Sequence, residues 1–467
     1  MSYKDIQLKA FDEMCDVLFD DNKTPEVHAE NLKYIYKSLF NTKELEFDLS
    51  KTINGFKLAF ENNPAETIKK MLESSDFVAH FGEVFTPDSL IKDMLSKLPR
   101  AVWTNPNLKW LDNSCGSGNF LVFIKNKLMK TLKDVIPNDF DREKHIVENM
   151  LYGCELQAKN IVLTLQRLNE KFEANIANED ALAFDYWGMK FDVIAGNPPY
   201  NQGGGGTQSL YHKFIKKSLG LLNENGYLVY VNPPGWRKPS NDKADFAGMF
   251  DLMTKDHQMI YLSIHQDKET FNLKSALRYD WYVIQNKVAS TATTISDIDG
   301  VKCKVNLKKY SFLPNGQIEF IQKITSSSKK CNLIYNRSNY GSDKKWVSDT
   351  ETDEFCYKLV SGVNAKGVSY KFSKVNDRGH FGIPKVIFGD SGSKGFTHPV
   401  IDINGEYGMT QHAMAIPCKD LEEAEKIASV MRSPKFQQMI ADYLIYSQFQ
   451  VEYLTIAELN HGFWNEF

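Results

Sequence analysis

The chain has 467 residues, a length that allows two or three domains with complete hydrophobic cores. Hydrophobic residues make up 42% of it and charged residues 25%, as in an ordinary globular protein, and no extended low-complexity segment is present. The formal net charge of −3 gives no overall sign of nucleic-acid binding, so a DNA-binding surface would have to be a local basic face.

Taken from the N-terminus, the sequence divides into three segments. Residues 1–76 carry apolar residues at helical spacing and predict helices, including one over 27–40. Between residues 77 and 290, apolar strands alternate with amphipathic helices, which predicts a doubly wound, largely parallel α/β sheet. Residues 291–467 have shorter strands, glycine-rich loops and a second helical pattern, and they predict a separate mixed α+β domain. The strands expected in the middle segment are residues 108–112, 150–155, 191–197, 226–232, 259–265 and 278–286.

Two further features bear on the compartment of the protein. No apolar run approaches the roughly 18 residues that cross a bilayer, and residues 1–14 lack the apolar core of a signal peptide, so we expect no membrane contact. The seven cysteines are scattered without a Cys-x-x-Cys pair, which excludes the common zinc spacings. We therefore expect reduced thiols, most of them buried, in a cytoplasmic protein.

A glycine-rich turn follows the first predicted strand. In "WLDNSCGSGNFLVF" (110–123), Asp112 ends the strand, Gly116 and Gly118 follow, and a helix begins. Ligands of doubly wound sheets bind beyond the carboxyl ends of the strands, and glycines let them approach the backbone. The third glycine of the dinucleotide motif is absent, which argues against a pyrophosphate site. The alternative is a tight strand-to-helix turn without a ligand.

An acidic residue ends the second strand, and another ends a third strand that is expected just before Asp180, in addition to the six strands given above. Glu155 in "YGCEL" could bind ribose hydroxyls, and Asp180 in "NEDAL" could accept a hydrogen bond from an adenine amine. Taken singly, such an acid is more often a helix cap or a solvated loop residue. Three consecutive strands that each end in an acid, beside a glycine turn, favour a nucleoside-type ligand.

The fourth predicted strand ends in the tetrapeptide Asn197-Pro198-Pro199-Tyr200. The prolines fix the backbone and lack an N–H, so the Asn197 side-chain oxygen and the Pro198 carbonyl can act as two fixed acceptors. Tyr200 adds an aromatic face, and the group suits a planar ligand with an exocyclic amine. The alternative is a strand-terminating turn. A second Asn-Pro-Pro at 232–234 lacks the aromatic residue, and we interpret it as structural.

On these residues the chain resembles the S-adenosylmethionine-dependent amino-methyltransferases of DNA, specifically the adenine-N6 enzymes of the gamma arrangement. The resemblance implies a Rossmann-like methyltransferase domain over 77–290, a helical region over 1–76 and a target recognition domain over 291–467. It is strong over 77–290 and faint beyond. The matching segments, in chain order, are residues 80–90, 111–121, 152–156, 178–182 and 195–201.

The resemblance also implies roles for individual residues. It implies direct transfer of a methyl group to an adenine flipped out of double-stranded DNA, with neither a metal nor a covalent enzyme intermediate. Thr86 and Pro87 also suit a helix N-terminus, and Trp281 and Tyr282 could equally be strand core. The implied roles are methionine-side contacts for Thr86 and Pro87, the cofactor cradle for Asp112, Cys115, Gly116 and Gly118, a ribose contact for Glu155, an adenine-ring contact for Asp180, the target-base clamp for Asn197, Pro198, Pro199 and Tyr200, and target-base stacking for Trp281 or Tyr282.

Two departures from the family pattern are visible. Asn113 stands where a proline is usual, and Gln157 stands where an acid is common. We expect the first to be tolerated because the glycines remain, and the second to change some cofactor contacts. The four glycines at 203–206 predict either a mobile loop that closes over DNA or a plain connector.

Several alternatives stay open at this stage. The C-terminal segment mixes Lys and Arg with Tyr, Trp and Phe, which favours DNA recognition over a plain solvated surface. The same tetrapeptide would serve a methyltransferase acting on RNA, on protein glutamine or on cytosine N4. A fused nuclease is disfavoured by the short N-terminal segment, and a non-catalytic DNA-binding relative by the intact clamp. We expect a monomer, and the sequence leaves open a separate restriction endonuclease as a partner.

Overall fold

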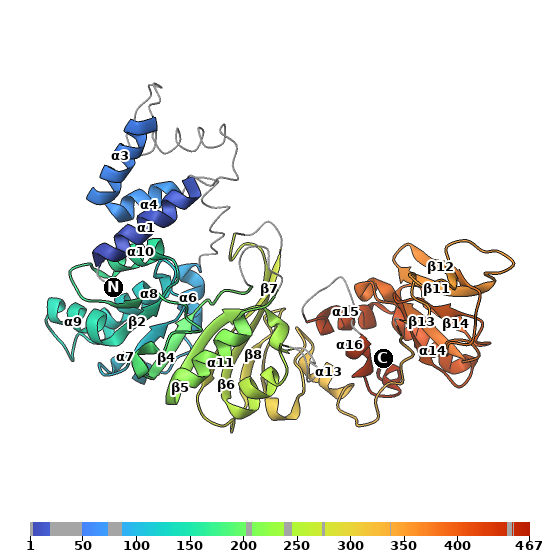
Figure 1. The fold of residues 1–467 in the computed structure, drawn as a ribbon. Coiled ribbons are helices and arrows are strands. Elements are labelled where there is room, and N and C mark those ends of the chain that lie inside the picture. Colours follow the sequence, from blue (N-terminus) through green and yellow to red (C-terminus); the bar gives the residue numbers. More distant parts are fainter. Residues whose placement is uncertain are drawn as a thin grey trace. The chain divides into compact units, whose positions relative to one another are not determined.

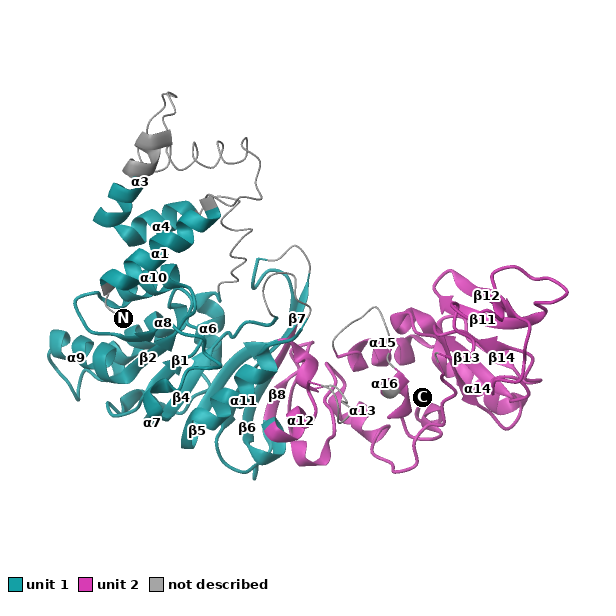
Figure 2. Cartoon of the chain, viewed as in Figure 1, with its two compact units in different colours: residues 1–232, 253–262, 266–293 teal, residues 233–252, 263–265, 294–467 magenta. Residues whose placement is uncertain are grey.

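In this computed structural model the chain forms two compact units (Figure 2): residues 1–232, 253–262 and 266–293 make up the first, and residues 233–252, 263–265 and 294–467 the second. The helix expected at 27–40, the start of the motif at 80–85 and the glycines 203–206 lie outside the described residues. The division at residues 76 and 290 stays a prediction. The structure describes residues 3–18, 49–72, 86–201, 208–237, 245–272, 276–336, 338–445, 451 and 453–467 (Figure 1).

The first unit is built on a twisted sheet with the strand order β3-β2-β1-β4-β5-β7-β6. The strands from β3 to β5 are parallel, whereas β7 runs antiparallel to β5. All six predicted strands are present, and the sheet is a mixed one of Rossmann-like order. The strands are β1 (Trp110–Asp112), β2 (Leu151–Cys154), β3 (Asn175–Ala177), β4 (Phe191–Gly196), β5 (Leu222–Asn232), β6 (Gln258–Asp267) and β7 (Leu277–Gln285).

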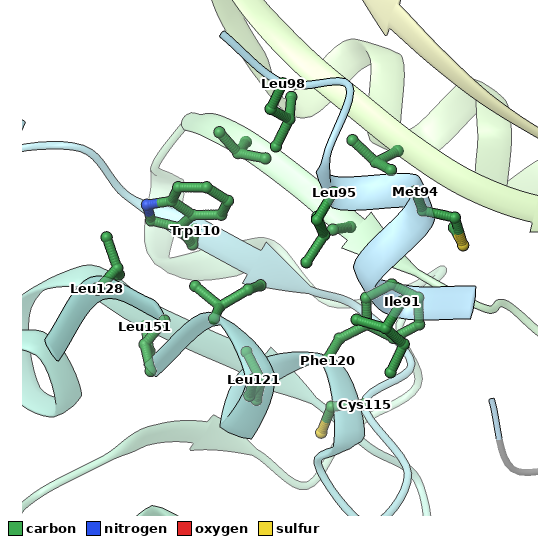
Figure 3. Close-up of a cluster of buried hydrophobic side chains, with 14 of the residues drawn as sticks. Ile91, Met94, Leu95, Leu98, Trp110, Cys115, Phe120, Leu121, Leu128 and Leu151 are labelled. Carbon is green, nitrogen blue, oxygen red and sulfur yellow. The ribbon is translucent and has the colours of Figure 1, made fainter. Parts of the chain in front are cut away.

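Helices cover this sheet and fix its first loop. Phe120 and Leu121, at the start of α8, are buried beside Ile91 of α6 and Trp110 of β1 in the main core of the unit (Figure 3). Because these side chains anchor the first turn of α8, the loop between β1 and α8 is held at the carboxyl edge of the sheet. The helices are α6 (Asp88–Leu95), α7 (Arg100–Thr104), α8 (Asn119–Thr131), α9 (Asp139–His145), α10 (Ala158–Leu168) and α11 (Tyr211–Leu221).

The N-terminal helices pack onto α10. The buried face of α1 (Tyr3–Leu18) includes Ala10 and Met14, and it shares a hydrophobic cluster with Ile161 of α10. Residues of α3 (Leu49–Asn62) and α4 (Pro64–Leu72) complete this cluster. Each fully buried large side chain contributes on the order of 1.5–3 kcal/mol, so the cluster holds α1 against α10. Helices were expected here from the apolar spacing.

The second unit is a mixed α+β structure. It contains a four-stranded sheet of order β10-β12-β11-β15 and a three-stranded sheet of order β14-β13-β16. Its core is formed by the three-stranded sheet and by α14 and α15. Its elements include β9 (Lys302–Val305), α13 (Ile318–Lys323), β10 (Val347–Ser348), β11 (Tyr357–Asn364), β12 (Gly367–Ser373), β13 (Lys385–Gly389), β14 (Val400–Asp402), β15 (Gly408–Met409), β16 (Ala413–Pro417), α14 (Leu421–Arg432), α15 (Pro434–Tyr443) and α16 (Tyr453–Ala457), with α12 (Met249–Asp251) and most of β8 (Thr293–Ser296).

The seven cysteines all lie in the described ranges and are free thiols; four of them are buried, so the expectation that most are buried is confirmed. Within those ranges, no helix combines the length and the apolar character needed to span a membrane.

Candidate active site

The carboxyl ends of β1, β2 and β4 lie at one edge of the sheet of the first unit. Asp112 pairs with Gly153 of β2, and Leu111 pairs with Ile194 of β4, so these parallel strands end side by side. A Cβ atom on Gly196 would lie only 2.6 Å from Oδ1 of Asp112. The Asp112 carboxyl group therefore packs directly on the backbone that precedes Asn197, at a place where only glycine fits.

The loop after β1 folds back over the end of β2. The Cys115 N–H donates to the Cys154 carbonyl at 3.1 Å, and the Gly116 N–H donates to Oε2 of Glu155 at 3.0 Å. Gly116 and Gly118 have φ values of +51° and +85°, in the left-handed region that favours glycine. Thr164 Oγ1 on α10 donates to the Gly116 carbonyl at 2.9 Å. The predicted cradle residues are thus brought together with Glu155.

Asp112 and Glu155 give this edge an acidic character. Glu155 also accepts a hydrogen bond from the Gln157 N–H through Oε1, at 2.9 Å. Burial raises the pKa of the Asp112 carboxyl to about 8; the Ser114 N–H that donates to it at 3.1 Å opposes this shift, and the charge of Glu155 adds to it. A cationic ligand beside such a buried carboxyl group would stabilise its ionised form and lower its pKa.

Asp180 lies beyond the end of β3. It is exposed, and its Oδ1 accepts a hydrogen bond from the Leu182 N–H at 2.9 Å. Its carbonyl accepts from the Ala183 and Phe184 N–H groups, so Asp180 begins a tight turn. Asp180 thus makes the contacts of a solvated loop residue, which was the alternative considered from the sequence. Its contact with the adenine of a cofactor stays a prediction.

Asn197 has an oriented side chain. Its Nδ2 donates to Oγ1 of Thr86 at 3.0 Å. Its Oδ1 is buried and finds no hydrogen-bond partner among the described residues. Such an acceptor costs on the order of 1–3 kcal/mol unless a ligand or water satisfies it. The amide therefore presents its acceptor end, and not its donor end, to the site.

The remainder of the tetrapeptide flanks this acceptor. Pro198 is buried and Pro199 is exposed. The ring of Tyr200 packs edge-on against Tyr211 with 6.5 Å between centroids, and its hydroxyl is buried without a partner in the described parts of the chain. Burial, with a smaller contribution from Tyr279, raises the pKa of Tyr200 above its usual value. Its hydroxyl stays a neutral donor at physiological pH.

Thr86 belongs to a chain of hydrogen bonds that the sequence did not indicate. The N-cap of α6 is Pro87, without a side-chain cap, so the N-cap role considered for Thr86 is wrong. The Thr86 carbonyl instead accepts from Asn119 Nδ2 at 3.2 Å, and Asn119 Oδ1 accepts from Arg167 Nη1 at 2.6 Å. One feature of the sequence could have drawn attention to Asn119: it directly follows the glycine turn. The bond from Asn197 to Thr86 continues this chain to the tetrapeptide.

Asn113, which replaces the usual proline, is held by a second network. Its Nδ2 donates to Ser218 Oγ at 2.9 Å, and its Oδ1 accepts from the Tyr230 hydroxyl. The Ser218 and Tyr230 hydroxyl groups are themselves 2.7 Å apart. All three residues are buried, so the loop after β1 is tied to α11 and β5. The glycines alone do not account for the position of this loop.

The second Asn-Pro-Pro differs from the first in its hydrogen bonds. Asn232 is fully buried, and its Oδ1 accepts from the Tyr282 hydroxyl at 2.6 Å. Trp281 is also buried and stacks on Tyr261 with 5.0 Å between ring centroids. These contacts are those of strand core, which was the alternative for both aromatic residues. A role in base stacking for Trp281 or Tyr282 stays a prediction.

Part of the chain is similar in sequence to known proteins. Residues 124–271 match the Eco57I restriction-modification methylase family. This segment is less than half of the chain, and it contains Glu155, Asp180 and the tetrapeptide. An uncharacterized adenine-specific methylase of Mycoplasma pneumoniae (strain ATCC 29342 / M129 / Subtype 1) is 25% identical over 269 residues, which cover 40% of this chain and 63% of the relative. The chain thus spans less than two thirds of that relative.

A solved structure extends the likeness to the fold. The Type IIL restriction-modification enzyme MmeI, solved in complex with DNA, superposes with a TM-score of 0.55 at 12% identity. The superposition covers 98% of this chain and 88% of that one. At this identity the likeness concerns the fold alone.

The buried Asp112 predicts an effect of pH on stability. A carboxyl group whose pKa is raised from about 4 in the unfolded chain to about 8 in the folded chain contributes stability that is fully present below about pH 4 and is lost progressively as the pH rises to about 8. We expect Asp112→Asn to raise the free energy of unfolding relative to wild type, by more at about pH 8.5 than at about pH 5. Guanidinium unfolding at the two pH values measures this. Asp180→Asn, at an exposed carboxylate, is the control; an equal effect of Asp112→Asn at both pH values contradicts the prediction.

Proposed function

We propose that the first unit transfers a methyl group from S-adenosylmethionine to the N6 amino group of an adenine in double-stranded DNA. The observation that carries this proposal is the buried Oδ1 of Asn197, which has no hydrogen-bond partner among the described residues and is oriented by Thr86 beside a glycine loop and two acids. Pro198 and Pro199 have no N–H, so they cannot donate to that oxygen. The site therefore retains acceptors for an external amine.

The residues at the strand ends fit the proposed cofactor. Besides Asn197, the buried Ser114 Oγ and Gln157 Oε1 lack hydrogen-bond partners among the described residues, which suits a ligand rich in hydroxyl and amine groups. Glu155 would hold the ribose hydroxyls and Asp180 the adenine amine. Asp112, Thr86 and the glycine loop would hold the methionine part. When bound, S-adenosylmethionine supplies an electrophilic methyl group with a positive charge, which the Asp112 carboxylate complements.

The tetrapeptide would act on the nucleophile. The lone pair of an adenine amino group is delocalised into the ring, which makes the amine a weak nucleophile. Hydrogen bonds from its two N–H groups to Asn197 Oδ1 and the Pro198 carbonyl become stronger as positive charge develops on the nitrogen, so they stabilise the transition state more than the ground state. The ring of Tyr200 would stack on the base. A base inside a duplex cannot reach these groups, so the adenine must be flipped out.

The comparisons support DNA as the substrate and adenine as the base. The matched family is one of restriction-modification methylases, and the Mycoplasma relative is described as adenine-specific. Acceptors and an aromatic ring would also suit cytosine N4, RNA or a protein glutamine. These substrates are therefore alternative outcomes of the test below.

We propose that the second unit recognises the DNA target. A cation–π pair lies on its four-stranded sheet, where Lys358 of β11 is 4.1 Å from the centroid of Tyr370 of β12; a second pair, Arg378 with its guanidinium 4.1 Å from the centroid of Trp346, lies outside the strands. In such a pair the aromatic ring holds the cation in place. Positively charged side chains fixed in this way could contact DNA phosphates and base edges. Both pairs lie in residues 291–467, where the sequence mixes Lys and Arg with Tyr, Trp and Phe.

The test of the activity uses the full chain and labelled S-adenosylmethionine. We expect label in unmethylated long DNA, identified by mass spectrometry as N6-methyladenine, and a loss of at least about 100-fold in Asn197→Ala, because the acceptor is gone. Asn201→Ala, at an exposed asparagine of the same loop, is the control and should keep its activity. Label in RNA, in protein or on cytosine instead would contradict the proposed substrate, and no transfer would contradict the proposed activity.

A second prediction concerns the orientation of Asn197. Thr86→Val keeps the shape of the side chain but removes the acceptor for Asn197 Nδ2, so the amide is free to turn its donor end to the base. We expect kcat to fall by about 10-fold or more, the size of a lost hydrogen bond of 1–3 kcal/mol. Thr86→Ser retains the hydroxyl and should stay within about 3-fold of wild type by the same reasoning. Steady-state kinetics at saturating cofactor measure both variants, and equal kcat values for them would contradict the assigned contact.

A further inference from the structure

Helix α1 reaches the loop that carries Glu155. Figure 1 shows α1 beside α10, and the two helices share the hydrophobic cluster of the N-terminal region. Lys9 and Glu13 are one helical turn apart and therefore lie on one flank of α1. Each makes a hydrogen bond to a residue more than a hundred positions away in the sequence.

Glu13 caps α10 from outside that helix. Its Oε1 accepts from the Ala158 N–H at 2.9 Å, and its Oε2 accepts from the Lys159 N–H at 3.1 Å. The N-cap residue of α10, Gln157, makes no side-chain cap of its own. The first N–H groups of a helix lack internal partners and favour a carboxylate, so Glu13 fixes the point where α10 begins.

The capped end of α10 carries the turn that positions Glu155. Gln157 lies two residues after Glu155 and donates its N–H to the Glu155 carboxylate at 2.9 Å. The same carboxylate accepts from Gly116 in the loop after β1. A shift of the first turn of α10 would therefore move the carboxylate that faces the glycine loop.

Lys9 supports the same turn by a second route. Its Nζ donates to Asn178 Oδ1 at 2.6 Å. Asn178 Nδ2 in turn donates to the backbone carbonyls of Glu155, at 3.0 Å, and Leu156, at 2.7 Å. The backbone on both sides of the Glu155–Leu156 peptide bond is thus held by an amide that α1 orients.

We propose that α1 is a brace for the ribose side of the cofactor site, and that Glu13 and Lys9 are positioning residues for Glu155. This inference rests on the proposed function, in which Glu155 binds the cofactor ribose. Glu13 and Lys9 act through Glu155 and Asn178 and take no part in methyl transfer itself. Removing them weakens cofactor binding and leaves kcat at saturating cofactor unchanged. By linkage, bound cofactor in turn stabilises the docking of α1.

The first experiment measures the Kd for S-adenosylhomocysteine by calorimetry on the full chain. We expect Glu13→Ala to weaken binding by about tenfold, as for the loss of one helix cap, and Lys9→Met to weaken it by several-fold. Glu13→Gln keeps one acceptor oxygen and should bind with an intermediate Kd. The controls Asp12→Ala and Lys4→Met change the same charges at exposed positions of α1 and should match wild type.

The second readout uses the wild-type chain, so it does not depend on the folding of a variant. Hydrogen exchange of the α1 amides should become slower when S-adenosylhomocysteine is added. Unchanged Kd values in Glu13→Ala and Lys9→Met would overturn the brace, as would a lower kcat at saturating cofactor or unchanged exchange in α1. A wild-type chain that does not bind S-adenosylhomocysteine would overturn the proposed function, and the brace with it.

Discussion

The hydrogen bond from Asn197 Nδ2 to Thr86 Oγ1 is the interaction on which the site depends. An amide has a donor end and an acceptor end of nearly equal size, and only a partner can decide which end faces a ligand. Thr86 takes the donor end, and the acceptor is left buried, with no partner in the parts of the chain that the structure describes. This arrangement costs free energy in the ligand-free protein, and it pre-orients the site for an amine.

The rest of the first unit keeps that contact in place. Parallel strands bring Asp112, Glu155 and Asn197 to one edge, and Gly196 allows the Asp112 carboxyl group to lie against the backbone of the tetrapeptide. A buried polar network then ties Asn113 to α11 and β5, and a second, partly exposed chain of hydrogen bonds ties Thr86 to α8 and α10. Because burial raises the pKa of the Asp112 carboxyl group, we expect this acid to reduce stability at neutral pH, a cost that functional sites often carry.

Much of this could be predicted from the sequence, because strands, helices and the residues at strand ends leave local patterns. The strands of the first unit and the positions of Asp112 and Glu155 at strand ends are examples. Contacts between distant segments leave no such pattern: nothing near Glu13 indicates that it caps α10, and nothing near Asn113 indicates its bonds to Ser218 and Tyr230. The antiparallel direction of β7 and the Pro87 N-cap likewise depend on tertiary packing.

The most direct measurement is a crystal structure of the full chain with S-adenosylhomocysteine. The account predicts the ribose hydroxyls on the Glu155 carboxylate, and the sulfur atom on the side of the site where Asn197 Oδ1 lies, with Asn197 Nδ2 still bonded to Thr86. A nucleoside bound away from Glu155, or an Asn197 amide that has left Thr86 and turned its donor end to the site, would contradict it.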